Sequence, residues 1–220
     1  MAPLPAKPAD RPPPTLPVVE TFHSLQGEGF HAGRSAFFIR LGGCTVGCPW
    51  CDTKHSWQEA AHPRRSLQDL AAAAAAAAQA GAAFAVITGG EPLQHRLDDL
   101  CAAIAVVLPE LPLHLETSGV HGLSGHFAWI TLSPKPHHPP TQELLDACQE
   151  LKVVVHGLDD LAFAETMAAT ARRRTGATRP LLLLQPGWDS RRGQELAVNY
   201  VRHHPDWRLS LQSHKWLGVR

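Results

Sequence analysis

At 220 residues the chain has the size of one domain and is long enough to bury a sizeable apolar core. Its 20 Lys and Arg balance its 20 Asp and Glu, so the composition does not indicate the basic face of a protein that binds nucleic acid. No apolar run approaches the roughly 18 residues of a membrane span, so we expect no membrane anchor.

The N-terminal segment is rich in proline. Its first 17 residues hold seven prolines and no apolar stretch of signal-peptide length. This composition predicts a disordered tail over residues 1–17, followed by a single domain over residues 18–220. Five cysteines without a secretion signal favour a reducing compartment, and we expect the cytoplasm.

Short runs of β-branched and aromatic residues then alternate with longer helical patterns. Strands are predicted at residues 18–24, 36–41, 83–88, 113–117, 128–132, 151–155, 180–184 and 207–211. Helices are predicted at residues 66–80, 93–108, 142–148, 158–174 and 191–203, the first with Ser66 as its N-cap. This alternation is typical of an α/β fold with a largely parallel sheet. A closed barrel usually takes about 250 residues, so we expect a shortened, open (partial) TIM-like barrel.

Polar and glycine residues follow the predicted strands where they end. The segments concerned are GGEP, ETSG, SPK, QPG and QSHK. Because the carboxyl ends of parallel strands meet at one edge, the pattern predicts a site at the C-terminal ends of the strands.

Three cysteines lie within eight residues: Cys44, Cys48 and Cys51. This spacing is compatible with a zinc site completed by a histidine such as His55, or with a redox pair beside a bystander thiol. It is also compatible with an iron–sulfur cluster that has three thiolate ligands and one open iron. The spacing alone does not decide among these sites. The other two cysteines stand in apolar helical runs and are predicted to be core thiols: Cys101 and Cys148.

The segment CTVGCPWC at 44–51 resembles the cluster-binding motif of the radical S-adenosylmethionine (SAM) superfamily, and TGGEP at 88–92 resembles its glycine motif. Further segments, in order, resemble the 7-carboxy-7-deazaguanine synthase family: FHSLQGEG, GRSAFFIRLGGC, CDT, ETSG, SPK, ELKVVV, QP and RLSLQSHKWLGVR. The resemblance covers nearly everything after the proline-rich segment. It implies a 4Fe–4S cluster on the three cysteines, with SAM bound at the fourth iron.

The resemblance implies a radical SAM enzyme that converts 6-carboxy-5,6,7,8-tetrahydropterin to 7-carboxy-7-deazaguanine by ring contraction with loss of ammonia. It also implies magnesium, an electron donor such as flavodoxin or ferredoxin, and a homodimer. Two alternatives stay open. Another radical SAM enzyme, such as a glycyl-radical activase, would keep the cysteines and TGGEP. A non-enzymatic zinc-binding module would leave the polar residues at the strand ends unexplained.

The resemblance also assigns individual residues. The ligands expected for the cluster and for magnesium are Cys44, Cys48, Cys51 and Thr53. The residues expected at SAM are Gly89, Gly90, Glu91, Glu116, Ser133, Lys135 and Gln185. The residues expected at the substrate are Gln26, Glu28, Arg40, Thr88 and His214, with His214 close to the reacting carbon as a catalytic residue.

Some of these residues have simpler explanations. Arg40 stands in an otherwise apolar strand, where its guanidinium suits the substrate carboxylate but also suits a structural salt bridge. Thr53 suits magnesium, or it caps the turn after the cysteines. Asp52 is expected to bond to the loop backbone. The TGGEP segment also reads as a strand-to-helix turn with Pro92 in the first helical position.

Overall fold

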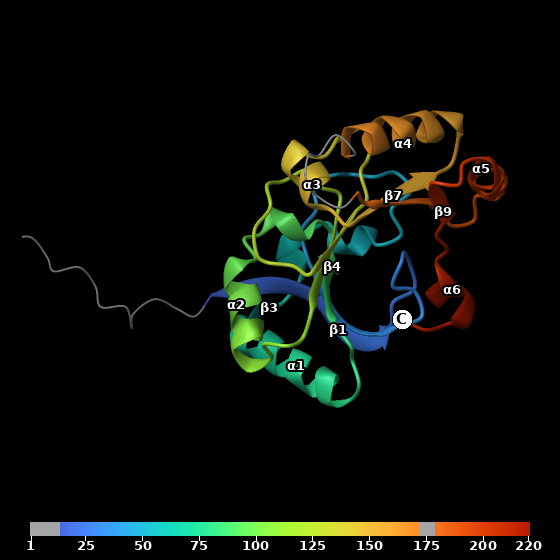
Figure 1. Cartoon of the computed structure of the whole chain (residues 1–220). Helices are drawn as coiled ribbons and strands as arrows, with labels where there is room; N and C mark the ends of the chain where they lie inside the picture. The colour runs from blue at the N-terminus through green and yellow to red at the C-terminus, as the bar shows by residue number, and fades with distance from the viewer. Residues whose placement is uncertain (1–13, 172–178) are drawn as a thin grey trace, which may run out of the picture.

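Nine strands form one sheet in this computed structural model, which describes residues 14–171 and 179–220 (Figure 1). The strands are β1 Thr15–Leu25, β2 Ser35–Leu41, β3 Arg64–Ser66, β4 Ala85–Gly89, β5 Leu113–Thr117, β6 Trp129–Leu132, β7 Glu150–Val155, β8 Leu181–Pro186 and β9 Trp207–Leu209. Their order is β3-β1-β2-β4-β5-β6-β7-β8-β9. From β2 to β9 neighbours run parallel, whereas β1 is antiparallel to β2 and β3. The predicted open, partial barrel is confirmed, because this order does not return on itself.

The first five helices cover the outside of the curved sheet, whereas the sixth lies at the carboxyl ends of the strands (Figure 1). They are α1 Leu67–Gln79, α2 Asp98–Val107, α3 Gln142–Ala147, α4 Leu158–Ala171, α5 Arg191–His203 and α6 Ser213–Leu217. Three 3-10 turns lie at η2 Lys54–Ser56, η3 Glu59–Ala61 and η4 Pro92–Gln94. Helix α1 begins as predicted, since Ser66 Oγ accepts a hydrogen bond from the Asp69 N–H at 3.1 Å.

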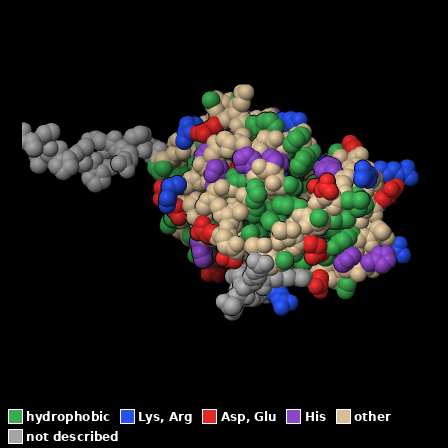
Figure 2. Space-filling view, turned by 90° about the horizontal axis from the view of Figure 1, so that it is seen from above, with side chains coloured by type: hydrophobic (Ala, Val, Ile, Leu, Met, Phe, Trp, Pro, Cys, Tyr) green, Lys and Arg blue, Asp and Glu red, His purple; other side chains and the backbone are tan. Residues whose placement is uncertain are grey.

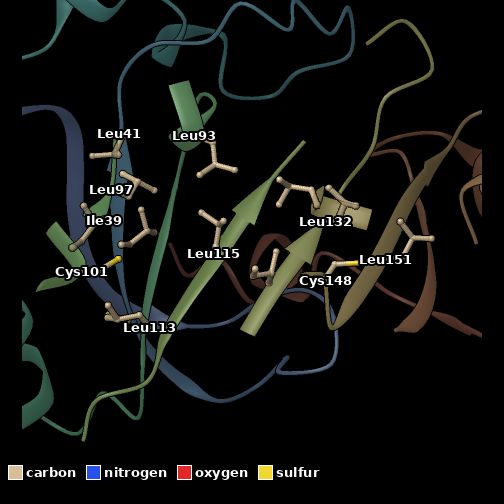
Figure 3. Packing of buried hydrophobic residues seen from close by; sticks show 14 of the residues in the cluster. Ile39, Leu41, Leu93, Leu97, Cys101, Leu113, Leu115, Leu132, Cys148 and Leu151 are labelled. Atoms are coloured by element: carbon tan, nitrogen blue, oxygen red, sulfur yellow. The ribbon is translucent and has the colours of Figure 1, made fainter. Parts of the chain in front are cut away.

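The two faces of the sheet differ in chemistry. The face under the helices is the main core, which includes Ile39, Leu115 and Leu151 (Figure 3). Cys101 and Cys148 are buried in this core, so they are core thiols as predicted. Side chains alternate along a strand, so the residues between these core positions point into the barrel. There a small aromatic cluster gives way to polar groups toward the strand ends.

Several boundaries differ from the prediction. Strand β1 begins at Thr15 rather than at residue 18, because residues 15–17 pair with β3 and bury Leu16. The predicted tail is therefore shorter, and residues 1–13 lie outside the described part of the chain, as do residues 172–174 of the fourth predicted helix. The second predicted helix is interrupted, with η4 preceding α2. The short elements β3 and α6 were not predicted.

The surface carries charges of both signs. On the face in Figure 2, Lys and Arg are interspersed with Asp and Glu around the rim. Within the residues that the structure describes, no helix is both long enough and apolar enough to cross a membrane.

Candidate active site

Two adjoining pockets open at the carboxyl ends of the parallel strands. The cysteine chamber is lined by residues that include Cys44, Cys48, Cys51, Gly90, Glu91, Ser133, Lys135, Lys152 and Gln185. The arginine chamber is lined by residues that include Gln26, Arg40, Thr53, Thr88, Gly89 and His214. Four residues line both and form the wall between the chambers: Glu28, Asp52, Glu116 and Gln212. Every residue predicted for the site therefore lies at one or both chambers, while the role of each stays a prediction.

The cysteine loop brings its three thiols to one chamber. Gly43 and Gly47 have φ angles of 104° and 70°, a region that favours glycine and lets the loop turn tightly. Burial raises the pKa of Cys44, while backbone N–H groups of the loop directed at its sulfur oppose that effect. Burial likewise raises the pKa of Cys48, and the nearby Lys135 ammonium lowers it. Soft sulfur donors with backbone N–H groups aimed at them fit an iron–sulfur cluster.

The glycine motif packs directly behind this loop. The Gly90 N–H donates to the Leu41 carbonyl at 3.0 Å, and the Glu91 N–H donates to the Gly43 carbonyl at 2.8 Å. A Cβ atom at Gly90 would lie 2.4 Å from the Gly43 carbonyl oxygen and 2.8 Å from Cys44 Cβ. Only glycine leaves room for this approach, so the motif fixes the position of the first cysteine.

The Glu91 side chain is buried and holds several backbone segments together. Its Oε1 accepts hydrogen bonds from Thr117 Oγ1 at 2.5 Å and from the Leu93 N–H at 3.1 Å. Its Oε2 accepts from the N–H and the hydroxyl of Ser118, at 2.8 and 2.5 Å. Pro92 stands in the first turn of η4, so the strand-to-helix interpretation of TGGEP holds as well. Because each carboxylate oxygen already accepts two hydrogen bonds, Glu91 fastens the β4 and β5 exits to one another.

Lys135 and Gln185 form other walls of the cysteine chamber. Lys135 Nζ donates to the carbonyl and the hydroxyl of Ser133, at 2.5 and 2.7 Å. Burial lowers the pKa of Lys135. Gln185 is buried, and its Oε1 accepts from Ser210 Oγ at 2.8 Å. These groups can hold the polar parts of a cofactor against the cysteine loop.

In the arginine chamber, Arg40 makes a salt bridge. Its Nε donates to Glu20 Oε1 at 3.0 Å, and Arg220 Nη2 lies 2.8 Å from Glu20 Oε2. Both guanidinium groups lie near the Phe22 ring, at 6.0 and 5.7 Å from its centroid. The structural salt bridge considered for Arg40 is thus present, although Arg40 also lines the chamber. Neither Glu20 nor Arg220 was predicted as part of the site.

The wall between the chambers is built from hydrogen-bonded carboxylates. Glu116 accepts from Gln26 Nε2 at 2.9 Å and from Thr88 Oγ1 at 3.0 Å. Glu28 accepts from Gln212 Nε2 at 2.8 Å and pairs with the Lys152 ammonium. Three predicted residues from β4, β5 and the β1 exit therefore meet at Glu116.

The segment after the cysteines points toward the arginine chamber. Thr53 precedes η2, but its side chain makes no capping hydrogen bond, and its hydroxyl lies 3.5 Å from Cys51 Sγ. Asp52 does not bond to the loop backbone as expected but pairs with Lys215 at 2.5 Å, because α6 brings that ammonium over the loop. Across the described residues, no three His, Cys, Asp or Glu side chains are placed to hold one metal ion.

His214, on α6, lies against the loop after β1. A Cβ atom at Gly27 would lie 2.0 Å from the imidazole Nδ1, so the ring rests directly on the Gly27 backbone. The Ser213 N–H and hydroxyl both donate to the Gly27 carbonyl, at 2.9 Å each. These bonds anchor α6, and the ring of His214 lines the arginine chamber next to the predicted substrate residues.

The comparisons with known proteins cover almost the whole chain. The family model of the radical SAM superfamily matches residues 38–161. The 7-carboxy-7-deazaguanine synthase of Prochlorococcus marinus is 53% identical over 220 residues, covering 93% of this chain and 98% of that protein. That of Synechocystis sp. is 48% identical over 206 residues, covering 94% of each. The crystal structure of QueE from Escherichia coli superposes with a TM-score of 0.77 at 31% identity, covering 91% of this chain and 95% of that one.

Proposed function

The chain belongs to the 7-carboxy-7-deazaguanine synthases of the radical SAM superfamily, and from this premise we propose how its two chambers divide the reaction. The enzyme converts 6-carboxy-5,6,7,8-tetrahydropterin to 7-carboxy-7-deazaguanine with loss of ammonia. The observation that carries the proposal is the shared wall, which places the three cysteines on one side and Arg40 on the other. Membership in this family sets aside the zinc-binding module and the glycyl-radical activase.

The cysteine chamber is the place for the cofactors. Cys44, Cys48 and Cys51 would hold the 4Fe–4S cluster, and Ser133 and Lys135 would contact the ribose and carboxylate of SAM. When bound, the cluster and SAM supply the radical chemistry that removes a hydrogen atom from the substrate. The chain's own part is to hold the loop rigidly through Gly90 and to keep the chamber walls in place.

The arginine chamber is the place for the pterin. The Arg40 guanidinium would bind the substrate carboxylate, and its salt bridge with Glu20 would orient the guanidinium. Gln26, Thr88 and Glu28 present hydrogen-bonding groups that suit the amide and amino edge of the ring. The His214 imidazole would cover the pterin ring from α6 and would lie near the reacting carbon. The direct test is anaerobic turnover of the carboxytetrahydropterin by the reconstituted enzyme, with detection of the product by mass.

Arg40→Ala is expected to raise the KM for the pterin roughly 10- to 150-fold, since losing one charge-assisted pair costs roughly 1.5–3 kcal/mol. The affinity for SAM should change less than about twofold, because Arg40 lines only the arginine chamber. Substrate KM and SAM Kd are measured side by side. The control is Arg96→Ala, whose guanidinium is on the surface. A large change in SAM affinity with an unchanged pterin KM would contradict the assignment.

Magnesium would bind at Thr53, which lines the arginine chamber and whose hydroxyl makes no capping hydrogen bond and only a 3.5 Å contact with Cys51 Sγ. Magnesium favours oxygen ligands and usually retains water and substrate oxygens, so one protein hydroxyl is a sufficient anchor. Turnover should be several-fold faster with magnesium than after chelation, and Thr53→Ala should lose this response with its iron content unchanged. Thr166→Ala, on the surface of α4, should keep it. If Thr53→Ala responds to magnesium as the wild type does, the hydroxyl has no role at the metal.

The remaining partners are proposed on the same basis. Reduction of the cluster requires a low-potential donor such as flavodoxin or ferredoxin, and a homodimer is the expected assembly. Three clustered thiols that must stay reduced until they bind iron suit the cytoplasm.

A further inference from the structure

Strand β7 places an ammonium group inside the barrel. Glu150 and Lys152 both point inward, and the Lys152 side chain is only 7% exposed. Barrel interiors are normally filled by branched apolar side chains, and an unpaired charge there is costly. Lys152 therefore depends on a partner, and none of the roles described so far uses it.

That partner is Glu28, which lines both chambers. The Lys152 ammonium donates to Glu28 Oε2, and Gln212 donates to Oε1 at 2.8 Å. Gln185 donates to the same carboxylate, so Lys152, Gln212 and Gln185 together leave about one of its four acceptor positions for a ligand. The Glu28 carboxylate is thus held by a residue of β7 at one oxygen and by a residue just before α6 at the other.

The electrostatics keep this pair ionised. Burial alone would raise the pKa of Glu28, but the Lys152 charge and the hydrogen bonds from Lys152, Gln212 and Gln185 lower it to about 2. Burial would lower the pKa of Lys152, and the surrounding carboxylates raise it instead. The charged groups around the pair are Glu116 on β5, Lys135 after β6 and Glu150 on β7.

We propose that Lys152 is a positioning residue of the reaction, which holds the Glu28 carboxylate across the junction of the chambers so that it accepts an N–H group of the pterin. This inference rests on the proposed function. A carboxylate that only accepts hydrogen bonds matches a ring edge that offers N–H donors, whereas a protonated or rotated Glu28 would not. Lys152 acts through Glu28 and does not itself contact the substrate.

A double-mutant cycle tests this dependence. Glu28→Gln should lower kcat/KM for the pterin roughly 10- to 150-fold, mainly through KM, as the loss of one charge-assisted hydrogen bond predicts. Lys152→Met should lower it roughly tenfold, with kcat nearly unchanged. The double variant should match Glu28→Gln within about twofold, because Lys152 has nothing left to position. If the two losses multiply instead, Lys152 acts by another route and the proposal is overturned.

The pH profile provides a second readout. In the wild type Glu28 stays ionised far below neutrality, so its titration adds no step to kcat/KM between pH 6 and 8. In Lys152→Met only the hydrogen bonds from Gln212 and Gln185 oppose the effect of burial, so the pKa of Glu28 rises and kcat/KM should increase with pH as the carboxylate ionises. Stability should move in the opposite direction: relative to the double variant, Lys152→Met should lose stability as pH rises through that raised pKa. An unchanged pH profile of kcat/KM would show that Lys152 and Glu28 form only a structural ion pair.

Two further outcomes are distinguishable. If Lys152→Met does not fold, the double variant, which buries neither charge alone, is compared directly with Glu28→Gln, and any loss beyond about twofold overturns the proposal. If the wild type forms no product from the carboxytetrahydropterin, the proposed function fails and this inference fails with it. An active wild type with multiplying losses overturns the inference alone.

Discussion

Cys48→Ala is expected to reduce product formation to background and to lower the iron content well below the about four irons per chain expected of the reconstituted wild type. Cys48 is the most buried of the three loop thiols and faces the Lys135 wall of the cysteine chamber. No other cysteine lies in this loop to replace it, so cluster binding and SAM cleavage should both be lost. Iron, sulfide and 5′-deoxyadenosine are quantified after anaerobic reconstitution.

The matched control is Cys101→Ala, which removes a thiol from the core between α2 and the sheet. Its expected cost is in stability, because the substitution leaves a small cavity. Iron content and turnover should stay at the wild-type level. Full activity in Cys48→Ala, or loss of the cluster in Cys101→Ala, would show that the cluster is not held by this loop.

Gly90→Ala is expected to have the second-largest effect, through the backbone rather than through a ligand. The new methyl group would stand 2.4 Å from the Gly43 carbonyl oxygen, a separation that real contacts do not show. The loop cannot move away easily, because the His95 ring bonds to the neighbouring Gly42 carbonyl at 2.7 Å. Overpacking of this kind costs roughly 1–3 kcal/mol. We expect a folded protein with lowered iron content and turnover, measured by iron assay and circular dichroism.

Gly157→Ala is its control. Gly157 follows β7, and a Cβ atom there would meet no heavy atom within 4 Å. Stability should change by less than about 0.5 kcal/mol, and cluster content should not change. A Gly90→Ala enzyme that binds iron and turns over like Gly157→Ala would show that the glycine motif does not position the cysteine loop.

The sequence predicted those parts of the fold that a local pattern determines. Most strands appear where β-branched and aromatic runs end in polar residues, and Ser66 caps α1 as its position indicated. Strand β3 and helix α6 were not predicted, because each is too short to show a periodic pattern in the sequence. Strand β1 begins early because residues 15–17 are held by pairing with β3, and no local propensity reports such a partner.

The site also contains residues that the sequence predicted and residues that it did not. Residues in glycine-rich or cysteine-rich segments, such as Gly90 and Cys44, were recognisable from their motifs. Glu20 and Lys152 were not, because each is a charged residue inside a regular strand whose meaning depends on a partner brought close by folding. Glu20 on β1 pairs with Arg40 on the adjacent strand β2, and Lys152 pairs with Glu28, which lies 124 positions away in the chain. A motif that resembles a family predicts which residues contact the cofactor, but it says little about the side chains that support those residues.

The wall between the chambers has a consequence for how the enzyme is made. Its Glu28 and Gln212 are joined across 184 positions of the chain, whereas the cysteine loop is complete at Cys51. From Cys51 to Gln212 the ribosome adds 161 residues (212 − 51), which at about 5–20 residues per second takes roughly 8–32 s. Throughout that interval the three thiols exist without the completed wall that later separates them from the second chamber. Synthesis itself therefore sets an order, in which the proposed ligands of the cluster are made first and the proposed compartment for the substrate is completed last.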